Sequence, residues 1–180
     1  GGRPLVQSLS TLACYAPRRR EYFTGELMAT LKIVQDGDID PDNLRGSWAG
    51  AFGHTQFMPS TFQRLAVDGD GDGHRDIMMS VPDAVASTAN FLRKAGWSNS
   101  LPWGYEVRLP AGFNTGLAGR KKKRAVSAWA AMGVTRVDGR PLSGNYQAGI
   151  IIPAGAGGPA FLVTKNFDAV YSYNAAESYG

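Results

Sequence analysis

The most constraining feature of the sequence is an alternating run of aspartate and glycine at residues 68–73. Carboxylates spaced this closely repel one another unless a hard cation lies between them, and glycine permits the sharp turn that such a loop needs. The pattern matches the first half of an EF-hand calcium loop. In that pattern Asp68, Asp70 and Asp72 supply side-chain oxygens, and His74, at the seventh position, supplies its backbone carbonyl.

The second half of this loop departs from the EF-hand pattern. An EF-hand places a bidentate glutamate at the twelfth position, where this chain has Met79. Asp83, four residues further on, can close the coordination sphere instead. Ser80-Val81-Pro82-Asp83 also has the form of a helix capping box, so Asp83 has a second interpretation as the capping acid, and the two roles are compatible. We therefore predict a structural calcium site over residues 68–83, with a solvated acidic turn as the alternative.

Hydrophobic periodicity divides the chain into two lobes. Three helices are predicted before residue 100: one from Pro4, one over about residues 19–36 that Gly37 ends, and one from Ser80 to Gly96. Beyond Trp97 the pattern changes to short apolar runs bounded by Gly, Pro or Asn, which are typical of strands. The sequence therefore predicts an α+β fold, with a helical lobe over residues 1–100 and a small antiparallel β lobe over residues 101–180.

Within the β lobe, residues 105–109 alternate apolar and polar side chains, as in a half-buried strand. The apolar runs predict further strands at residues 150–152, 161–163 and 169–173. A tight turn is predicted at residues 137–140, and one short helix at about residues 125–132.

The apolar stripes predict which helical side chains form the core. Each helix has apolar residues at helical spacing: Leu5, Leu9 and Leu12 on the first, Phe23, Leu27, Leu31 and Val34 on the second, and Val85, Ala89 and Leu92 on the third. Cys14 is the single cysteine, which excludes an intramolecular disulfide. Its apolar neighbours predict a small buried core residue rather than a nucleophile.

Composition excludes several classes of protein. Hydrophobic residues make up 43% of the chain and charged residues 19%, which excludes a disordered tail. No run of about 18 apolar residues occurs, so no membrane span is expected, and membrane association would need an anchor outside this chain. The chain has 2 histidines, too few for a multi-histidine metal site.

Positive charge is modest overall but concentrated at one place. The formal net charge of +4 suits an anionic partner without selecting one. Five consecutive cations at residues 120–124 have the composition of a nucleic-acid patch, but no aromatic residues are interleaved with them. A solvated basic run is the favoured interpretation, and no nucleic-acid partner is expected.

A glycine-rich stretch at residues 46–60 is the second segment with candidate chemistry. Its small residues permit close approach of the backbone to a neighbour or a ligand. Gln56, Phe57 and Met58 then offer an amide and apolar surfaces, which suit sugar hydroxyls and pyranose faces. A tightly packed helix and loop without a ligand is the alternative.

These segments together resemble the lytic murein transglycosylase B family, also called transglycosylase domain type 2 or glycoside hydrolase family 103. The resemblance is carried, in order and along essentially the whole chain, by residues 17–23, 46–60, 68–76, 80–92, 105–113, 152–155, 158–162 and 173–174. It implies a lysozyme-like helical lobe. It also implies a carbon–oxygen lyase that cleaves the β-1,4 bond between N-acetylmuramic acid and N-acetylglucosamine in bacterial peptidoglycan and leaves 1,6-anhydromuramyl ends. One glutamic acid suffices in this reaction, because the nucleophile is the substrate's own C6 hydroxyl.

The resemblance also implies which residues contact the glycan. Ser47 and Gln56 would line the cleft with Phe57 and Met58 beside them, Tyr173 and Asn174 would approach the catalytic carboxylate, and Arg18 and Arg19 would meet the acidic stem peptide. Arginines on a helix surface are the alternative for Arg18 and Arg19. The implied partners are peptidoglycan glycan strands, and a monomer in the bacterial periplasm or cell envelope is expected.

The catalytic glutamate is expected upstream of Gly1, where the family has a Glu-Ser/Thr-x-x-Gly segment. Glu21 and Glu26 are expected to form surface pairs, Glu106 to point outward, and Glu177 only imitates the catalytic segment locally. Without its acid the chain would be inactive alone. A non-catalytic peptidoglycan-binding or scaffold module is therefore the alternative function, and a calcium-regulated switch is disfavoured because no second EF-hand is present.

Overall fold

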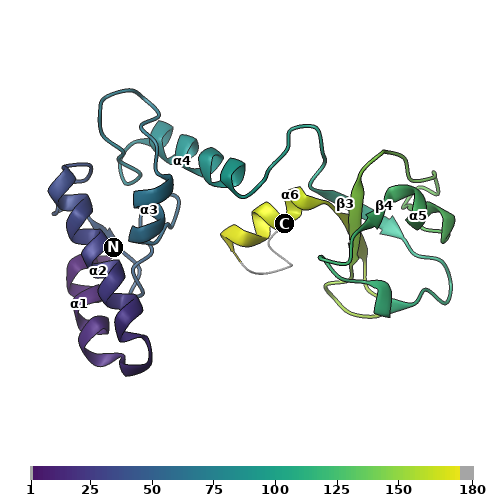
Figure 1. Ribbon diagram of the computed structural model, residues 1–180, viewed down its shortest axis with the longest axis horizontal. Coiled ribbons are helices and arrows are strands. Elements are labelled where there is room, and N and C mark those ends of the chain that lie inside the picture. Colours follow the sequence, from purple (N-terminus) through teal and green to yellow (C-terminus); the bar gives the residue numbers. More distant parts are fainter. Residues whose placement is uncertain (1, 175–180) are drawn as a thin grey trace. The chain divides into compact units, whose positions relative to one another are not determined.

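The computed structural model describes residues 2–174. The chain forms two compact units, Gly1–Phe91 and Leu92–Gly180, which we call the first and the second unit. Helices dominate the first and an antiparallel sheet dominates the second (Figure 1), so the predicted α+β class is confirmed. No helix within residues 2–174 is long and apolar enough to cross a lipid bilayer.

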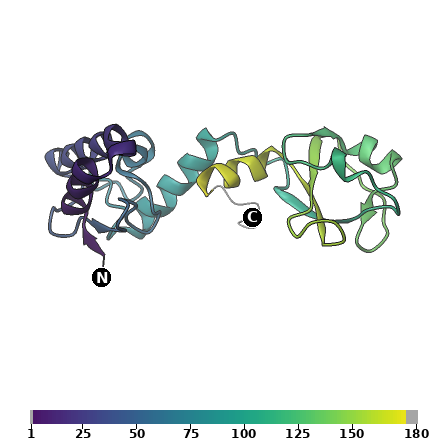
Figure 2. The ribbon, with the colours of Figure 1, turned by 90° about the horizontal axis from the view of Figure 1, so that it is seen from below.

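The first unit is built on two long helices that lie side by side (Figures 1 and 2). Its elements are β1 (Arg3–Pro4), α1 (Leu5–Tyr15), the 3₁₀ turn η1 (Pro17–Arg19), α2 (Arg20–Asp36), β2 (Arg45–Gly46), α3 (Pro59–Leu65) and α4 (Val81–Lys94), the last of which continues into the second unit. The short strands β1 and β2 pair antiparallel. Gly37 ends α2 in the left-handed conformation, with φ of 75°, as its position predicts.

The core of this unit is aromatic and aliphatic. Leu5 and Leu9 of α1 are fully buried, as predicted, and the rings of Phe52 and Phe62 lie 5.6 Å apart between the helices and the loop that follows β2. Helix α3, which the periodicity does not predict, brings Phe62 to this core. Its first residue is Pro59, whose fixed φ suits the first turn of a helix.

Three predictions about this unit are wrong. Three residues of the predicted core stripes are exposed: Leu31 (44%), Val85 (62%) and Ala89. The reason is that α2 packs against both α1 and α3, and α4 packs its other face on the aspartate loop. Glu26 does not form a surface pair: it is 4% exposed and turned inward. Cys14 is exposed rather than buried, since it lies in the last turn of α1 away from the leucine stripe.

The second unit contains a five-stranded sheet. Its strands, β3 (Gly104–Arg108), β4 (Arg124–Ala125), β5 (Thr135–Arg136), β6 (Gln147–Ile151) and β7 (Ala160–Val163), follow the order β4-β6-β7-β3-β5 with antiparallel neighbours. The remaining elements are η2 (Thr115–Leu117), α5 (Val126–Ala131) and α6 (Lys165–Tyr173). The predicted short helix is α5, and the predicted turn closes with a hydrogen bond from the Gly139 N–H to the Arg136 carbonyl, 2.9 Å long.

Side chains of the central strands alternate between the two faces of this sheet, and both faces are buried. Ile150 and Leu162 point to one face, where they pack in a cluster with Trp129 of α5. Ile151 and Val163 point to the other face and pack with Phe167 of α6. Each short helix therefore covers one face of the sheet.

The strand predicted at residues 169–173 is wrong, because these residues form the second half of α6. The Thr164 side chain caps this helix by accepting a hydrogen bond from the Asn166 N–H. The basic run is also less solvated than predicted. Arg120 and Lys123 are half-buried and both contact Asp168 of α6.

Candidate functional site

The glycine-rich stretch after β2 folds into one compact loop. Antiparallel bridges join Gly46 to Phe52 and Phe52 to Phe57, so the chain doubles back twice within a dozen residues. The Ser47 N–H donates to the Ala51 carbonyl at 2.7 Å, and the Ala51 N–H donates to the Ser47 Oγ at 3.0 Å. We call residues 46–58 the hairpin loop.

Glycine is required where this loop meets its neighbours. A Cβ on Gly46 would lie 2.4 Å from the Ala51 carbonyl oxygen, and a Cβ on Gly53 would lie 2.8 Å from the carbonyl oxygen of Ile77. Both neighbours are backbone atoms that cannot move aside cheaply. The small residues therefore serve close packing, and this packing fixes the position of the residues between them.

Gln56 has an unusual backbone conformation. Its φ is +52°, and no other non-glycine residue within residues 2–174 has a positive φ. This region is disfavoured for side chains with a Cβ, and such strain is often found at functional sites. The side chain is exposed and its Nε2 donates to the Gly53 carbonyl at 2.8 Å, which fixes the orientation of the amide.

The other predicted residues of the hairpin loop differ in access to solvent. Ser47 and Met58 are half-buried, and Met58 directly precedes α3. Phe57 is only 3% exposed and its ring lies 5.8 Å from that of Phe91, so the predicted contact of Phe57 with a sugar does not fit its burial. Trp48, which was not predicted as a site residue, is 68% exposed and borders a recess of about 390 Å³ beside α1.

Arg18 and Arg19 line an open groove along α2. The groove has a volume of about 1440 Å³, and Tyr22, Glu26 and Ser60 are also among its lining residues. The Arg19 guanidinium lies 4.5 Å from the centre of the Tyr22 ring. Burial, and then the Glu26 carboxylate, raise the pKa of the Tyr22 hydroxyl, while Arg19 opposes the shift.

Glu26 connects this groove to the hairpin loop through α3. Its Oε2 accepts from the Ser60 N–H at 2.9 Å and its Oε1 from the Ser60 hydroxyl at 2.7 Å. A carboxylate at a helix N-terminus satisfies a backbone donor that has no partner within the helix and interacts well with the helix dipole. The groove and the hairpin loop thus meet at the start of α3, where Ser60 follows Met58 and Pro59.

Tyr173 and Asn174 lie in the second unit, at the end of α6. Tyr173 is half-buried and is the last helical residue, and the exposed Asn174 follows as the C-cap. Its N–H donates to the Val170 carbonyl at 3.4 Å. Glu177 lies outside the described residues.

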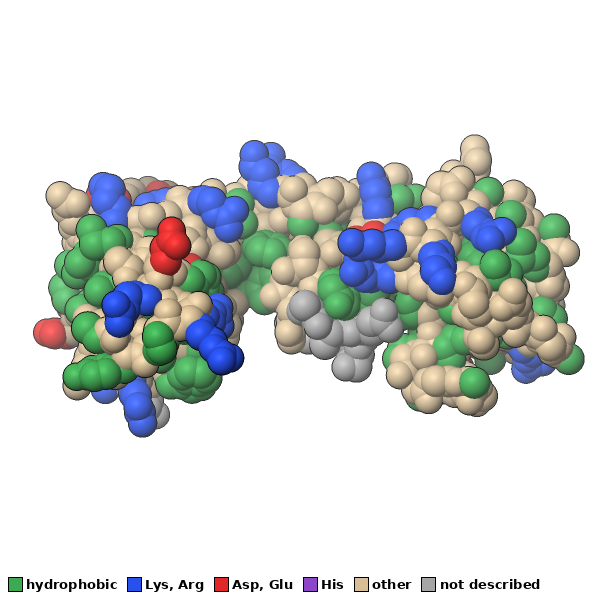
Figure 3. Space-filling model, turned by 60° about the horizontal axis from the view of Figure 1, so that its bottom comes forward, with side chains coloured by type: hydrophobic (Ala, Val, Ile, Leu, Met, Phe, Trp, Pro, Cys, Tyr) green, Lys and Arg blue, Asp and Glu red, His purple; other side chains and the backbone are tan. Residues whose placement is uncertain are grey.

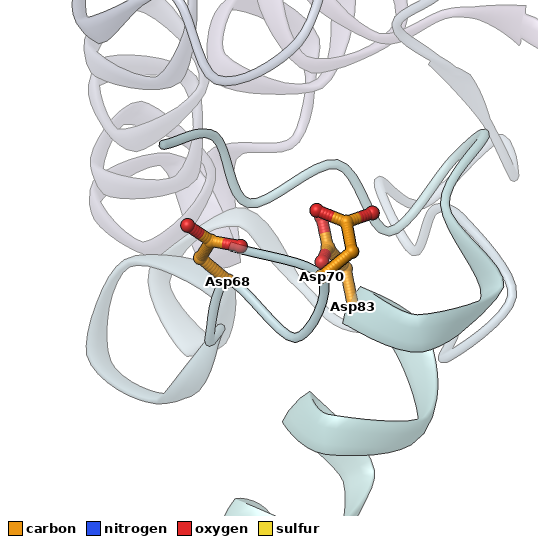
Figure 4. A group of neighbouring side chains, drawn as sticks. All are labelled: Asp68, Asp70 and Asp83. Carbon is orange, nitrogen blue, oxygen red and sulfur yellow. The ribbon is translucent and has the colours of Figure 1, made fainter. Parts of the chain in front are cut away.

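The aspartate loop brings three of its predicted ligands together. Oxygens of Asp68, Asp70 and Asp83 all lie within 4.8 Å of one another, and Figure 4 shows the first two on the loop and Asp83 at the start of α4. Asp72 and His74 are outside this group. Instead, the His74 N–H donates to the Asp72 carboxylate at 2.8 Å.

Asp83 is the buried centre of this arrangement, with 0% exposure. Its Oδ1 accepts from the Gly69 N–H at 2.7 Å and its Oδ2 from the Asp76 N–H at 2.6 Å, so one side chain ties both ends of the loop to α4. Only half of the predicted capping box forms. The Asp83 N–H donates to the Ser80 Oγ at 3.3 Å, but the Ser80 N–H donates to the Asp76 carbonyl rather than to Asp83.

The donor set of the loop fits a hard cation. The N–H groups of Gly73 and Gly71 donate to the Asp68 carboxylate and lower its pKa, which keeps it ionised. Each carboxylate oxygen that accepts one backbone N–H retains a second lone pair. Grouped carboxylate oxygens of this kind are the ligands that calcium prefers.

Comparisons with known proteins agree on one family. Residues 1–180 match the profile of the transglycosylase SLT domain. Membrane-bound lytic murein transglycosylase B of Escherichia coli (strain K12) is 37% identical over 185 residues, which cover 99% of this chain and 48% of that protein. The chain therefore spans about half the length of the curated relative it matches.

Solved structures are similar over the same range. SltB3 from Pseudomonas aeruginosa, in complex with NAG-anhNAM-pentapeptide, is 49% identical with a TM-score of 0.95, and the match covers 99% of this chain and 48% of that one. Escherichia coli Slt35, in complex with calcium, is 36% identical with a TM-score of 0.80, and the match covers 99% and 56% of the two chains.

Proposed function

The chain belongs to the transglycosylase SLT domain family, and on that basis we propose that it forms part of a lytic transglycosylase of bacterial peptidoglycan. The reaction would cleave the β-1,4 bond between N-acetylmuramic acid and N-acetylglucosamine and leave a 1,6-anhydromuramyl end. The observation that carries this proposal is the hairpin loop, in which close packing holds an exposed glutamine in a strained conformation. The complex of SltB3 with an anhydromuramyl peptide supports it.

We propose that the residues of the hairpin loop bind and orient the glycan. Within the described residues, the side-chain oxygen Oε1 of Gln56 and the second hydrogen on its Nε2 have no partner, so both can form hydrogen bonds with sugar hydroxyls. Ser47 supplies a hydroxyl on the same loop, and Trp48 supplies an exposed ring that suits a pyranose face. We propose that Tyr173 and Asn174, at the end of α6, also contact the glycan.

The proton donor of the reaction must protonate the leaving oxygen and then accept the proton of the C6 hydroxyl. We propose that Glu21, Glu26 and Glu106 do not have this role. Both Glu26 oxygens accept hydrogen bonds from Ser60, so this carboxyl group is already engaged at the start of α3. Glu21 and Glu106 are exposed, whereas the proton donor of this reaction is expected in a partly apolar pocket.

We propose that Asp68, Asp70 and Asp83 bind Ca²⁺ as a structural ion. The grouping of their oxygens and the calcium complex of Slt35 support this assignment. The ion would neutralise the repulsion between the loop carboxylates. Its role would be structural, because the grouped carboxylates join the aspartate loop to the start of α4. Asp72 and the His74 carbonyl would be further ligands only if the loop rearranges, since both lie outside the group.

We also propose that the protein acts in the bacterial cell envelope, in the periplasm. The Escherichia coli relative is named as a membrane-bound murein enzyme. Peptidoglycan strands are the proposed partner.

The test is incubation of this chain with purified murein sacculi, followed by mass spectrometry of the soluble products. Release of 1,6-anhydromuramyl products shows that the chain is an active lytic transglycosylase. Co-sedimentation with sacculi without turnover fits both a part that lacks the proton donor and the alternative, a peptidoglycan-binding module. Products that have only reducing ends, or no binding at all, contradict the proposal.

A Gln56→Ala variant locates the binding site. We expect it to bind a peptide-free muroglycan about tenfold more weakly, because an amide that makes two hydrogen bonds to sugar is lost. The matched control is Gln35→Ala, which removes the same amide from an exposed position of α2 outside the hairpin loop and the groove, and leaves glycan binding unchanged.

A further inference from the structure

The two units differ strongly in charge. The second unit has eleven Lys and Arg residues against four Asp and Glu, whereas the first has eight against eleven. The modest net charge of the chain thus conceals a strongly basic second unit. Figure 3 shows Lys and Arg side chains gathered on the face of this unit that is in view.

The basic run at residues 120–124 is held firmly on the second unit. The Gly119 N–H donates to the Ile150 carbonyl at 2.7 Å, the Lys122 N–H donates to the Gly119 carbonyl at 2.9 Å, and Arg124 begins the edge strand β4. The run is therefore a shaped surface rather than a loose tail.

Two cations of the run are used inside the unit. Asp168 accepts from Arg120 at 2.8 Å and from Lys123 at 2.5 Å, and the Arg120 guanidinium stacks 3.9 Å from the centre of the Tyr171 ring. These contacts attach α6 to the segment before β4. They also use the one carboxylate that the described residues place beside the run.

The remaining cations lack an acidic partner. Lys121, Lys122 and Arg124 of the run are exposed, as is Lys165, one turn before Asp168 on α6, and none of the four forms an ion pair within residues 2–174. We call these four residues the basic face. Residues 121 to 124 span at most about 11 Å, close to the Debye length of physiological salt, so their charges repel one another. A polyanion that binds there removes this repulsion.

The surroundings of the basic face restrict the kind of polyanion. Trp129 is fully buried and Tyr171 is covered by Arg120, so neither ring is open to stack on nucleic-acid bases. Within residues 92–174, the large hydrophobic residues that the second unit exposes are Trp103, Met132 and Val137. None of them is part of the run, so the described residues give it no apolar anchor for a lipid surface. Flexible lysines instead suit carboxylates spread along a polymer.

We propose that the basic face binds the carboxylates of peptidoglycan stem peptides, in addition to the glycan contacts of the hairpin loop, and so holds the second unit on the polymer. This inference rests on the proposed function. It adds a second contact of different chemistry, because the hairpin loop would bind sugar whereas the basic face would bind the acidic peptide. Linking two weak contacts on one polymer raises the overall affinity.

The test compares two triple variants of the whole chain with equal net charge. In the first, Lys121, Lys122 and Lys165 are changed to Gln. In the control, three exposed cations that are not part of the face, Arg64, Lys94 and Arg108, are changed to Gln. Co-sedimentation with sacculi is measured from about 50 to 200 mM salt, and circular dichroism and light scattering check folding and association.

We expect the first variant to bind sacculi about tenfold more weakly at low salt with a flatter salt dependence, and the control to stay within about twofold of wild type. Sacculi whose carboxylates are blocked by carbodiimide and glycinamide should bind wild type and the first variant equally. Equal losses in both variants, or undiminished binding of wild type to blocked sacculi, overturn the proposal. Tighter binding to phosphatidylglycerol vesicles than to sacculi assigns the face to a membrane and overturns it too.

The two proposals fail in different ways. Binding of the chain to peptide-free muroglycan depends on the hairpin loop and not on the basic face. Loss of that binding with retained dependence on carboxylates refutes the saccharide site alone, and the reverse result refutes the basic face alone. If the first variant self-associates while the control does not, the lysines of the wild type serve to prevent pairing of the edge strand β4 with another copy, and the proposal is wrong.

Discussion

The substitution Asp83→Asn tests the structure of the aspartate loop directly. The Asp83 side chain is fully buried, and each of its two oxygens accepts a backbone N–H, from Gly69 and from Asp76. Asparagine has the same shape but replaces one acceptor oxygen with an NH₂ group. That group then faces a backbone N–H, so two donors meet and one buried amide loses its partner.

The size of the effect follows from these two contacts. Loss of a hydrogen bond to a charged acceptor costs about 1.5–3 kcal/mol, and an unsatisfied buried N–H costs about 1–3 kcal/mol. Asp83→Asn should therefore lower the free energy of unfolding by about 3–5 kcal/mol in calcium-free buffer. For a unit of this size, that corresponds to a fall in melting temperature of at least about 10 °C.

The assay is thermal unfolding followed by circular dichroism in EDTA, with hydrogen exchange of the 66–80 peptide as a local readout. Asp72→Asn is the matched control, because this exposed carboxylate lies in the same loop but accepts only the His74 N–H. We expect it to cost less than about 1 kcal/mol. If the two variants melt within about 3 °C of each other, Asp83 does not hold the loop as argued.

Three further outcomes are expected. Calcium at 100 times its dissociation constant should stabilise the wild type by about 2.7 kcal/mol, and unchanged melting at millimolar calcium would remove the metal assignment. The N–H groups of Gly73 and Gly71 lower the pKa of Asp68 in the folded protein. Its contribution to stability is therefore present above the ordinary pKa of 3.8 and is lost as the pH falls through the lower pKa of the folded state. In EDTA, Asp68→Asn should lose less stability than wild type between pH 6 and pH 3, and equal losses would contradict this. Glu26→Ala should cost about 2–4 kcal/mol and Glu26→Gln about 1 kcal/mol in urea unfolding, because glutamine still accepts from the Ser60 N–H. Equal costs would show that the hydrogen bond retained by glutamine does not stabilise the fold.

Local signals in the sequence predict much of the fold. The positions of Gly37 and Gly96 predict where α2 and α4 end, since glycine adopts the left-handed conformation at little cost. Alternation at residues 105–109 predicts β3, and the aspartate spacing predicts the grouping of Asp68 with Asp70. In each of these cases the residues themselves carry the physical cause.

The sequence-based predictions are wrong where a contact with a residue far away in the chain determines the local structure. The run at 169–173 is apolar enough for a strand, but the Thr164 cap and the packing of Phe167 on the sheet favour a helix. Glu26 is turned inward because α3 presents an N-terminus that only a folded chain places beside it. The partner of Arg120 and Lys123 is likewise 45 or more residues away, at Asp168.

The candidate site shows the same division. Its residue types follow from the sequence, whereas access to solvent does not. Phe57 and Trp48 are both aromatic residues of the hairpin loop, yet the first is 3% exposed and the second 68% exposed. The antiparallel bridge that Phe57 forms with Phe52 decides this difference, and no local pattern reports it.

The left-handed backbone at Gln56 makes selection for stability and selection for glycan binding favour different residues at this position. Glycine at this position would relieve roughly 1 kcal/mol of conformational strain, so directed evolution for heat resistance would enrich it. A screen for retention on glycan would instead keep the amide. Libraries randomised at this codon and sorted both ways should therefore diverge there, and the glutamine marks a compromise between backbone strain and the proposed contact with glycan.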